Sequence, residues 1–401
     1  MARLDPDRLS RIGTWMQTYI DRRRFAGCAT LIFQEGEEVY YDARGLRDVE
    51  NGLPWERDTV ARVYSMTKPI ASVALMTLVE KGLFPLEAPV SDFIPGFSDC
   101  HALIPGATDI SQTEPCATPT LHQLLTHTSG LSYPFNPGVL GAAMHEVDLV
   151  FGPSSPSLAD MVDQLTSLPL AFAPGTRWEY SVGIDVIGRV IEVASGRTLE
   201  DFLVAEIFDP LGMAETRFAV PEHAVSRFAS LYTPLAGDPM DLHASAGDGD
   251  PLRLTDAPDG SPYLTTTMHS GGGGLVSTID DYVKFAEMLR AGGKGILSPA
   301  TLQFMMRNHL PGDIASMGPE SFAEQPMEGV GFGLGGGIVL DPGRARCPGS
   351  VGDFSWGGMA STFFWVDPVH KLSTVFLTQL SPSSSYPGRA ELKALVHGAL
   401  M

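Results

Sequence analysis

The chain has 401 residues, of which 44% are hydrophobic, and its formal net charge at pH 7 is -20. This length and apolar content are enough to bury a large core, and the length favours two structural lobes over one. The acidic balance disfavours nucleic acids and anionic membranes as partners, because phosphate groups are bound by basic surfaces.

The sequence gives no signal for targeting, a membrane or a cofactor. Its first residues hold no apolar stretch like a secretory signal, and no run of about eighteen apolar residues occurs, so we expect a cytoplasmic protein without a membrane partner. The ten histidines form no H-E-x-x-H motif. The four cysteines are too far apart for a zinc site, and we expect them to be reduced: Cys28, Cys100, Cys116 and Cys347. We therefore expect neither a metal nor another cofactor.

Hydrophobic periodicity predicts a helix, a hairpin and a second helix at the start of the chain. These elements are a helix at 6–24, strands at 28–34 and 39–43, and a helix at 66–80. Glu35-Gly36 separates the two strands, and a glycine there favours a tight hairpin turn. Gly82 is placed to end the second helix, whose apolar composition predicts a position in the core.

The middle of the chain, residues 89–263, is rich in Pro, Gly and Ser, and its periodic segments are mostly helical. Helices are predicted at 158–168, 181–195 and 198–208. The segment from Asp238 to Asp259 lacks periodicity and the calcium-loop pattern, so we expect a surface loop. Beyond it, strand-like runs at 331–340, 359–366 and 372–379 precede a helix at 390–400.

These elements predict an α/β (α+β) protein in which the two ends of the sequence supply a mainly antiparallel sheet flanked by helices. The middle of the chain supplies an inserted, mainly helical lobe. The predicted domains are residues 1–88 together with 264–401, and residues 89–263, with the active site between them.

Ser65 and Lys68 form the S-x-x-K motif Ser65-Met66-Thr67-Lys68 at the start of the predicted core helix. Residues three apart share a face of a helix, so the lysine amine can reach the serine hydroxyl. A desolvated lysine can accept the serine proton, and the helix N-terminus favours the alkoxide. The alternative is an N-cap serine with a solvated lysine. The motif occurs once, and the proline and apolar helix that follow favour a buried lysine.

Two later segments are candidates for the rest of a catalytic site. Tyr180 precedes an apolar helix, where its phenol could point into a cleft or simply pack at the surface. Trp356-Gly357-Gly358-Met359 precedes a strand, and its glycines would allow substrate close to the backbone, although such a run is also typical of a turn. The N–H groups of Ser65 and Met359 could together bind an oxyanion. His127 is interpreted as a structural residue at a helix-to-turn junction.

These three elements, in this order and at these separations, resemble the active-site motifs of the class C β-lactamase superfamily, and most closely its esterase branch, the family VIII carboxylesterases. The likeness extends over roughly residues 8–398, through segments such as Leu124 to Leu131 and Asp209 to Met213. The resemblance implies a β-lactamase/transpeptidase-like fold. It also implies Ser65 as the acylated nucleophile and Lys68 with Tyr180 as the acid/base pair. Backbone N–H groups of Ser65 and Met359 are implied as oxyanion donors, and Trp356, Gly357 and Gly358 as substrate-binding residues.

The sequence departs from the superfamily pattern at two positions. Trp356-Gly357-Gly358 stands where β-lactamases have Lys-Thr-Gly, so the cation and hydroxyl that hold a β-lactam carboxylate are missing. Val182 replaces an asparagine that orients substrate amides. A charged hydrogen bond contributes about 1.5 to 3 kcal/mol, so we expect little β-lactam hydrolysis and a preference for neutral esters.

The sequence therefore predicts a serine carboxylesterase for short- to medium-chain esters of small molecules. Three alternatives stay open: an acyltransferase, a D-amino-acid peptidase or amidase on the same site, and a non-catalytic sensor or scaffold. An α/β-hydrolase is disfavoured, because no G-x-S-x-G motif follows the glycine run that begins at Gly271.

Overall fold

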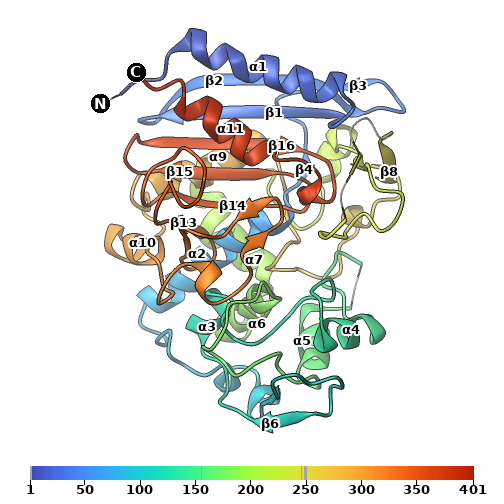
Figure 1. Ribbon diagram of the computed structural model, residues 1–401, viewed down its shortest axis with the longest axis vertical. Coiled ribbons are helices and arrows are strands. Elements are labelled where there is room, and N and C mark those ends of the chain that lie inside the picture. Colours follow the sequence, from blue (N-terminus) through green and yellow to red (C-terminus); the bar gives the residue numbers. More distant parts are fainter. Residues whose placement is uncertain (1, 155, 245, 248–250) are drawn as a thin grey trace.

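A computed structural model describes residues 2–154, 156–244, 246–247 and 251–401 of the chain (Figure 1). Residues 245 and 248–250, which belong to the predicted surface loop from Asp238 to Asp259, lie outside the described residues. No helix within the described ranges is long and apolar enough to cross a membrane.

The main sheet has eight strands in the order β12-β13-β14-β15-β16-β1-β2-β3, and neighbouring strands run antiparallel. Its strands are β1 (Gly27–Gln34), β2 (Glu37–Asp48), β3 (Leu53–Pro54), β12 (Val330–Phe332), β13 (Gly337–Val339), β14 (Phe354–Gly357), β15 (Phe363–Asp367) and β16 (Leu372–Thr378). Strands from the two ends of the sequence thus pair side by side, as the blue and red arrows in Figure 1 show. The predicted antiparallel sheet, and with it the β-lactamase/transpeptidase-like α/β fold, is confirmed.

The first hairpin follows from its turn residues. Glu35 and Gly36 both have positive φ, 56° and 93°, which suits a two-residue turn whose twist matches that of the strands. Gln34 pairs with Glu37 across the turn. The turn and register of this hairpin therefore follow from residues that are close together in the sequence.

Helices cover both faces of the sheet because its strands are apolar on both sides. In β1, Cys28 and Ile32 belong to the core under α1 (Pro6–Asp21) and α11 (Gly388–His397). Ala29 and Leu31 point the other way, as alternate strand residues must, into the core that includes α9 (Ile279–Arg290). Figure 1 shows α1 and α11 in front of the sheet and α9 behind it.

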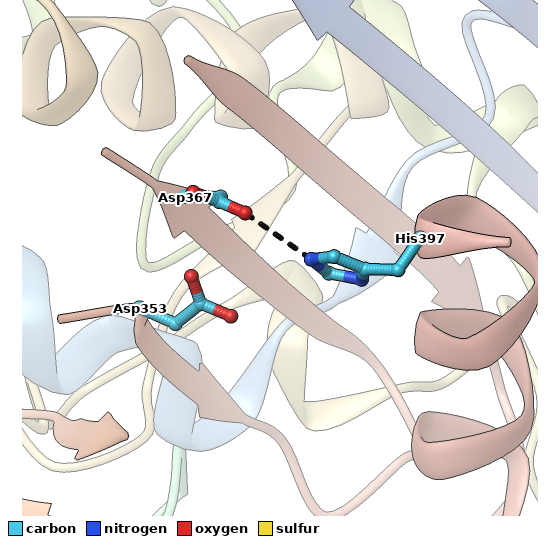
Figure 2. Close-up of side chains that lie close together, drawn as sticks. All are labelled: Asp353, Asp367 and His397. Carbon is cyan, nitrogen blue, oxygen red and sulfur yellow. Dashed lines mark hydrogen bonds and ion pairs between the residues drawn. The ribbon is translucent and has the colours of Figure 1, made fainter. Parts of the chain in front are cut away.

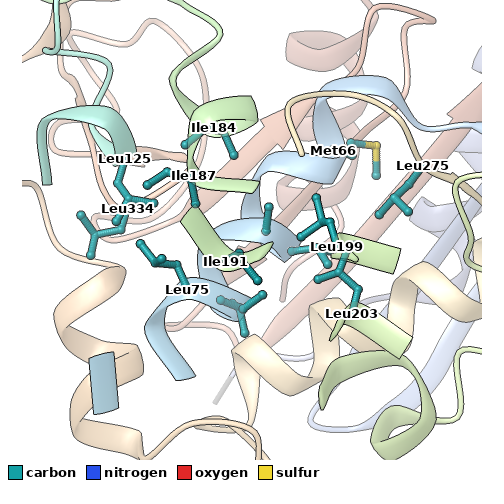
Figure 3. Close-up of a cluster of buried hydrophobic side chains, with 14 of the residues drawn as sticks. Met66, Leu75, Leu125, Ile184, Ile187, Ile191, Leu199, Leu203, Leu275 and Leu334 are labelled. Atoms are coloured by element: carbon teal, nitrogen blue, oxygen red, sulfur yellow. The ribbon is translucent and has the colours of Figure 1, made fainter. Parts of the chain in front are cut away.

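The helix that carries the S-x-x-K lysine is α2 (Thr67–Glu80), and its residues are buried from Thr67 to Leu78. Pro69 lies in its first turn, where a proline removes no intrahelical hydrogen bond. Its apolar side chains pack with those of α6 (Gly183–Ser195) and neighbouring segments, as Figure 3 shows for Leu75, Ile187 and Ile191. The prediction of a buried helix at 66–80 is confirmed.

The middle of the chain contributes mainly short helices and two small hairpins. The helices are α3 (Leu121–Leu125), α4 (Val139–Glu146), α5 (Leu158–Leu165), α6, α7 (Leu199–Leu203), a π-helical turn (Val204–Phe208) and α8 (Asp209–Leu211). The hairpins are β5 (His101–Leu103) with β6 (Thr113–Pro115), and β7 (Leu231–Thr233) with β8 (Arg253–Asp256). The predicted helices near 158, 181 and 198 are present. The proposed division into two domains stays a prediction.

Three local predictions need correction. The run 331–340 is a hairpin of β12 and β13 rather than one strand, because Gly335 takes a φ of 87° between them. Trp356 and Gly357 lie in strand β14, where a turn was predicted, because pairing with Phe363 and Phe364 of β15 overrides the weak strand propensity of the glycine. Residues within the predicted surface loop form strand β8.

Candidate active site

Ser65 lies in a single 3₁₀ turn, Tyr64–Met66, that leads directly into α2. The N–H groups at the start of such a turn have no intrahelical acceptor, so they are free to bind an anion. Tyr64, just before the serine, has a φ of 43°, which is unfavourable for an aromatic residue and is found where surrounding structure imposes it. The hydroxyl of Tyr282 donates to Met66 O at 2.8 Å and fixes the other side of the turn.

Lys68 is completely buried and its ammonium is surrounded by three acceptors. Its Nζ atom lies 3.2 Å from Ser65 Oγ, 2.9 Å from the Tyr133 hydroxyl and 2.6 Å from the carbonyl oxygen of Gly272. An ammonium group has three donors, so these three contacts use all of them. The buried position predicted for Lys68 is thus found, and the side chain cannot swing into water.

Tyr180 reaches the same serine from the middle of the chain, 115 residues further along the sequence. Its hydroxyl donates to Ser65 Oγ at 2.6 Å, and Lys68 Nζ lies 4.5 Å from the centre of its ring. The residue precedes α6 by three positions, in a segment held by Asn136, whose side-chain amide donates to Tyr180 O at 2.8 Å. The three residues that the sequence predicted to converge do lie together around one oxygen atom.

His127 adjoins this cluster through Tyr180. Its ring centroid lies 4.9 Å from that of Tyr180, and its Nδ1 accepts from the N–H of Ser181 at 3.3 Å. Burial, reinforced by the charge of Lys68, holds the pKa of His127 well below its usual range, so the imidazole is neutral. The residue supports the tyrosine and does not contact Ser65, in agreement with a structural role.

Tyr133 is the neighbour of Lys68 that sequence reasoning missed. Burial, together with the negative charge of Asp185, raises its pKa well above the usual range, so it remains a neutral phenol. Its ring lies 5.1 Å from that of Tyr180 and stacks on Phe135 at 4.7 Å. It comes from a segment without periodicity, and no pattern in the sequence marked it.

Trp356 forms one wall of the site as part of an aromatic cluster. Its ring lies 5.6 Å from Tyr180, 6.1 Å from Phe322 and 5.2 Å from Phe332. Val182, which stands at the asparagine position, is fully buried in the core.

The two glycines after Trp356 allow close approaches that a side chain would block. A Cβ atom on Gly357 would lie 2.7 Å from the Arg389 guanidinium, and one on Gly358 would lie 2.3 Å from the backbone oxygen of Val63. Gly358 therefore sets β14 against the segment that carries Ser65.

Met359 lies two residues beyond the end of β14, in the turn toward β15, and so corrects the expectation that it sits on the strand. Gly358 N–H donates to Thr362 O at 2.7 Å, whereas Met359 N–H makes no hydrogen bond to the described residues. The free N–H of Met359 and that of Ser65 fit the predicted pair of oxyanion donors. Their role stays a prediction.

The cluster opens into a cavity of about 1000 Å³. Its lining is largely apolar and aromatic, with contributions from Phe135, Phe151, Met240, Tyr263, Phe322 and Trp356. Three cations also line the cavity, and each has an acidic partner: Arg389 pairs with Glu324 at 3.0 Å, Lys393 with Asp353 at 2.8 Å and Arg346 with Glu328 at 3.4 Å. Burial raises the pKa of Glu324 despite its arginine partner. The cavity therefore suits a largely uncharged, apolar molecule.

Asp353, Asp367 and His397 form a second polar cluster, between the sheet and α11 (Figure 2). The ring nitrogens of His397 face two acceptors, Lys393 O at 2.9 Å and Asp367 Oδ2 at 3.2 Å. Both ring nitrogens are therefore engaged with groups of the protein itself. Lys393 Nζ lies 2.8 Å from Asp353 Oδ2. The cluster is an ion-pair network that joins α11 to the sheet.

A half-buried serine, a buried lysine one turn later and an antiparallel sheet beside them define a β-lactamase-like serine hydrolase, and the chain belongs to the Beta-lactamase family, whose model matches residues 12–398. The chain is 33% identical over 393 residues to esterase EstB of Burkholderia gladioli, with 94% of each protein covered.

Two further proteins are similar over nearly their whole length. Protein Rv1367c of Mycobacterium tuberculosis is 32% identical over 381 residues, which cover 92% of this chain and 90% of that protein. The solved structure of EstCE1, described as a hydrolase with promiscuous acyltransferase activity, matches with a TM-score of 0.81 and 28% identity and covers 98% of this chain and 99% of that one. The predicted resemblance to the esterase branch is confirmed.

Proposed function

We propose that this protein is a serine carboxylesterase that forms an acyl-enzyme on Ser65 and prefers neutral, fairly apolar esters. One observation carries the proposal: Ser65 Oγ lies within hydrogen-bond distance of both Lys68 Nζ, at 3.2 Å, and the Tyr180 hydroxyl, at 2.6 Å. A nucleophile that contacts two proton-transfer groups is the arrangement needed to attack an ester and then protonate the leaving alcohol.

In the first half of the reaction, the deprotonated member of the Lys68–Tyr180 pair, either the neutral amine or the phenolate, takes the proton of Ser65 as Oγ attacks the ester carbonyl. The two contacts do not distinguish Lys68 from Tyr180 as the first proton acceptor. The N–H groups of Ser65 and Met359 stabilise the negative oxygen of the tetrahedral intermediate. The proton then passes to the departing alcohol, and the acyl group stays on the serine.

In the second half, water attacks the acyl-enzyme and the same pair moves its proton back to Ser65. Because Tyr133 and the Gly272 carbonyl also bind Lys68, the ammonium keeps its position while the serine is acylated. The pair thus serves both halves without a conformational change.

The chemistry of the cavity supports the substrate class. Trp356 contributes an aromatic wall where a lysine would hold a carboxylate, and Glu324 neutralises Arg389. Similarity to EstB adds a relative that is named an esterase. We propose short- to medium-chain esters of small molecules as substrates, with slow β-lactam turnover at most. The expectations of a cytoplasmic location and of no nucleic-acid partner stay predictions.

Hydrolysis of p-nitrophenyl acetate and butyrate tests the proposal directly. Wild type should hydrolyse both esters, Ser65→Ala should show none of this activity, and Tyr180→Phe should lose about 10²- to 10⁴-fold in kcat, as expected for a proton-transfer group. A fluorophosphonate probe should label wild type but not Ser65→Ala. Undiminished turnover by Ser65→Ala would end the proposal, and absence of labelling in wild type would favour a non-catalytic sensor or scaffold.

A second candidate activity is acyl transfer, in which an alcohol replaces water as the attacking group. EstCE1 is a hydrolase with promiscuous acyltransferase activity, and the cavity of about 1000 Å³ has room for an acceptor molecule. Product analysis in the presence of competing alcohols separates the two activities. Ester products exceeding the acid product would assign acyl transfer, and acid alone would assign hydrolysis.

A further inference from the structure

Asp185 is a fully buried acidic residue in the first turn of α6, five residues after Tyr180. It faces the glycine segment, residues 270–274, which crosses next to the lysine of the site. Its Oδ1 atom accepts hydrogen bonds from Ser270 Oγ at 2.5 Å and from Gly272 N–H at 3.0 Å. A buried carboxylate costs stability unless it is compensated, so a residue of this kind needs a physical explanation.

Gly272 is bound on both sides of its backbone. Its N–H donates to Asp185, and its carbonyl oxygen accepts from Lys68 Nζ at 2.6 Å. The carbonyl contact is the shortest of the three that Lys68 makes. The Asp185 carboxylate therefore binds the same residue, Gly272, whose carbonyl oxygen accepts from the Lys68 ammonium. Through this residue it determines where the carbonyl is placed.

The packing between Asp185 and Gly272 is tight. A Cβ atom on Gly272 would lie 2.2 Å from Asp185 Oδ2, so only glycine allows this approach. Asp185 Oδ2 has no hydrogen-bond partner among the described residues, although it is buried. Its negative charge is opposed mainly by the charge of Lys68: burial raises the pKa of Asp185, and Lys68 counteracts this effect.

We propose that Asp185 is a positioning residue that holds the Gly272 carbonyl on Lys68 and so keeps Lys68 Nζ against Ser65 Oγ. The inference rests on the proposed esterase function, because its consequence is measured in ester turnover. Since α6 also follows Tyr180, the same side chain keeps the two proton-transfer groups in a fixed relation to each other.

The test compares Asp185→Ala and Asp185→Asn with a matched control. Asp281 is also buried in the first turn of a helix, and it accepts from a backbone N–H, that of Glu215 at 2.8 Å, and from the hydroxyl of Thr216 at 3.2 Å. It lies outside the site, so Asp281→Ala and Asp281→Asn remove a similar buried carboxylate without touching the glycine segment. The measurements are kcat and KM for p-nitrophenyl butyrate and Tm by circular dichroism.

We expect Asp185→Ala to lose about 10- to 100-fold in kcat with KM changed less than about threefold, the range expected when a charged hydrogen bond is removed. Asp185→Asn keeps an acceptor oxygen and should recover part of kcat. The Asp281 variants should lower Tm and leave kcat unchanged. If Asp185→Ala does not fold, Asp185→Asn alone decides, because its kcat should still fall below that of wild type.

The inference is overturned if both Asp185 variants keep wild-type kcat, if only KM changes, or if the Asp281 variants lose kcat equally. These outcomes differ from failure of the proposed function, in which wild type itself does not hydrolyse the ester. If wild type does not hydrolyse the ester, a crystal structure of Asp185→Ala tests the positioning role instead. A Lys68 Nζ that stays on Gly272 O would refute the role, and one that moves away would support it.

Discussion

Two lysines near the core of this protein have opposite surroundings. Lys68 is completely buried, and its three hydrogen-bond acceptors are two hydroxyls and a carbonyl. Among the described residues, no carboxylate forms an ion pair with it. Lys393, on α11, is 13% exposed and lies 2.8 Å from the buried carboxylate of Asp353. The first lysine is therefore held by neutral groups, and the second by an opposite charge.

This difference separates a residue built for chemistry from one built for stability. A direct ion pair fixes the protonation of an amine, because the charged form gains the attraction of its partner. Neutral acceptors favour the charged form of an amine less strongly than a carboxylate does. The amine therefore remains able to exchange a proton. The arrangement around Lys68 thus gives up part of the stabilisation that Lys393 has.

Replacement of Lys68 should have the largest effect. Lys68→Met keeps an unbranched apolar side chain but removes the amine, so kcat for p-nitrophenyl butyrate should fall about 10²- to 10⁴-fold. Lys68 forms no ion pair within the described part of the chain but offsets the charge of buried Asp185, so the free energy of unfolding should also decrease, by less than about 3 kcal/mol. Steady-state kinetics and urea unfolding measure the two quantities. A variant that retains activity would contradict the catalytic role of the lysine.

The same replacement at Lys393 should give the reverse result. Lys393→Met leaves the Asp353 carboxylate buried without its partner, which should lower the free energy of unfolding by about 3 kcal/mol. The kcat of the folded variant should stay within about twofold of wild type, because Lys393 makes no contact with Ser65. Urea unfolding is the measurement. Unchanged stability would show that the ion pair does not anchor α11.

Acid should weaken the ion-pair network that joins α11 to the sheet before it unfolds the rest of the protein. Although burial opposes ionisation, hydrogen bonds from His397, His370 and Ser350 lower the pKa of Asp367 from 3.8 to about 2. A carboxyl pKa that is lower in the folded state than in the unfolded state stabilises the folded state at pH values above the ordinary pKa. This stabilisation, about 2 kcal/mol, is lost as the pH falls from about 4 to about 2.

Urea unfolding at several pH values, with wild type and Asp367→Asn side by side, measures this contribution. The difference in the free energy of unfolding between the two proteins should be constant above about pH 5 and shrink below pH 4. Burial raises the pKa of Asp353 and the charge of Asp367 adds to this effect, so the opposing contribution of Asp353 is smaller in Asp367→Asn than in wild type. A difference that does not depend on pH would contradict the assignment.

The smallest expected effect is at Tyr133. Tyr133→Phe removes one of the three acceptors of Lys68 and leaves the ring in place, so kcat should fall about 10-fold with KM little changed. Phe135→Leu, at the ring that stacks on Tyr133, is the control for packing alone and should change kcat less. Equal effects of the two substitutions would mean that the hydroxyl does not matter.

The sequence predicted the parts of the site that depend on local order. Ser65 and Lys68 are one turn apart in a helix with a clear apolar pattern, so their relative position follows from helical geometry alone. The first hairpin and the helices near 158 and 181 have equally local causes in capping and turn residues. The resemblance to a known family then gave the place of Tyr180.

Contacts made over long distances in the chain could not be read in this way. Tyr133 comes from a segment without periodicity, and Asp185 looked like any acidic residue in the first turn of a helix. The end of strand β14 was taken for a turn because the two glycines after Trp356 have low strand propensity, and only pairing with β15 makes this segment a strand. In each case the decisive partner lies far away in the sequence.

The pairing of β1 with β16 has a consequence for synthesis of the protein. Thr378 Oγ1 donates to Gly27 O across 351 residues of sequence, and Ser65 lies in a helix whose sheet is completed only by such pairs. During synthesis, the reactive serine leaves the ribosome early and the last strands leave it late. A growing chain therefore contains its nucleophile long before it contains the strands that complete the sheet beside it.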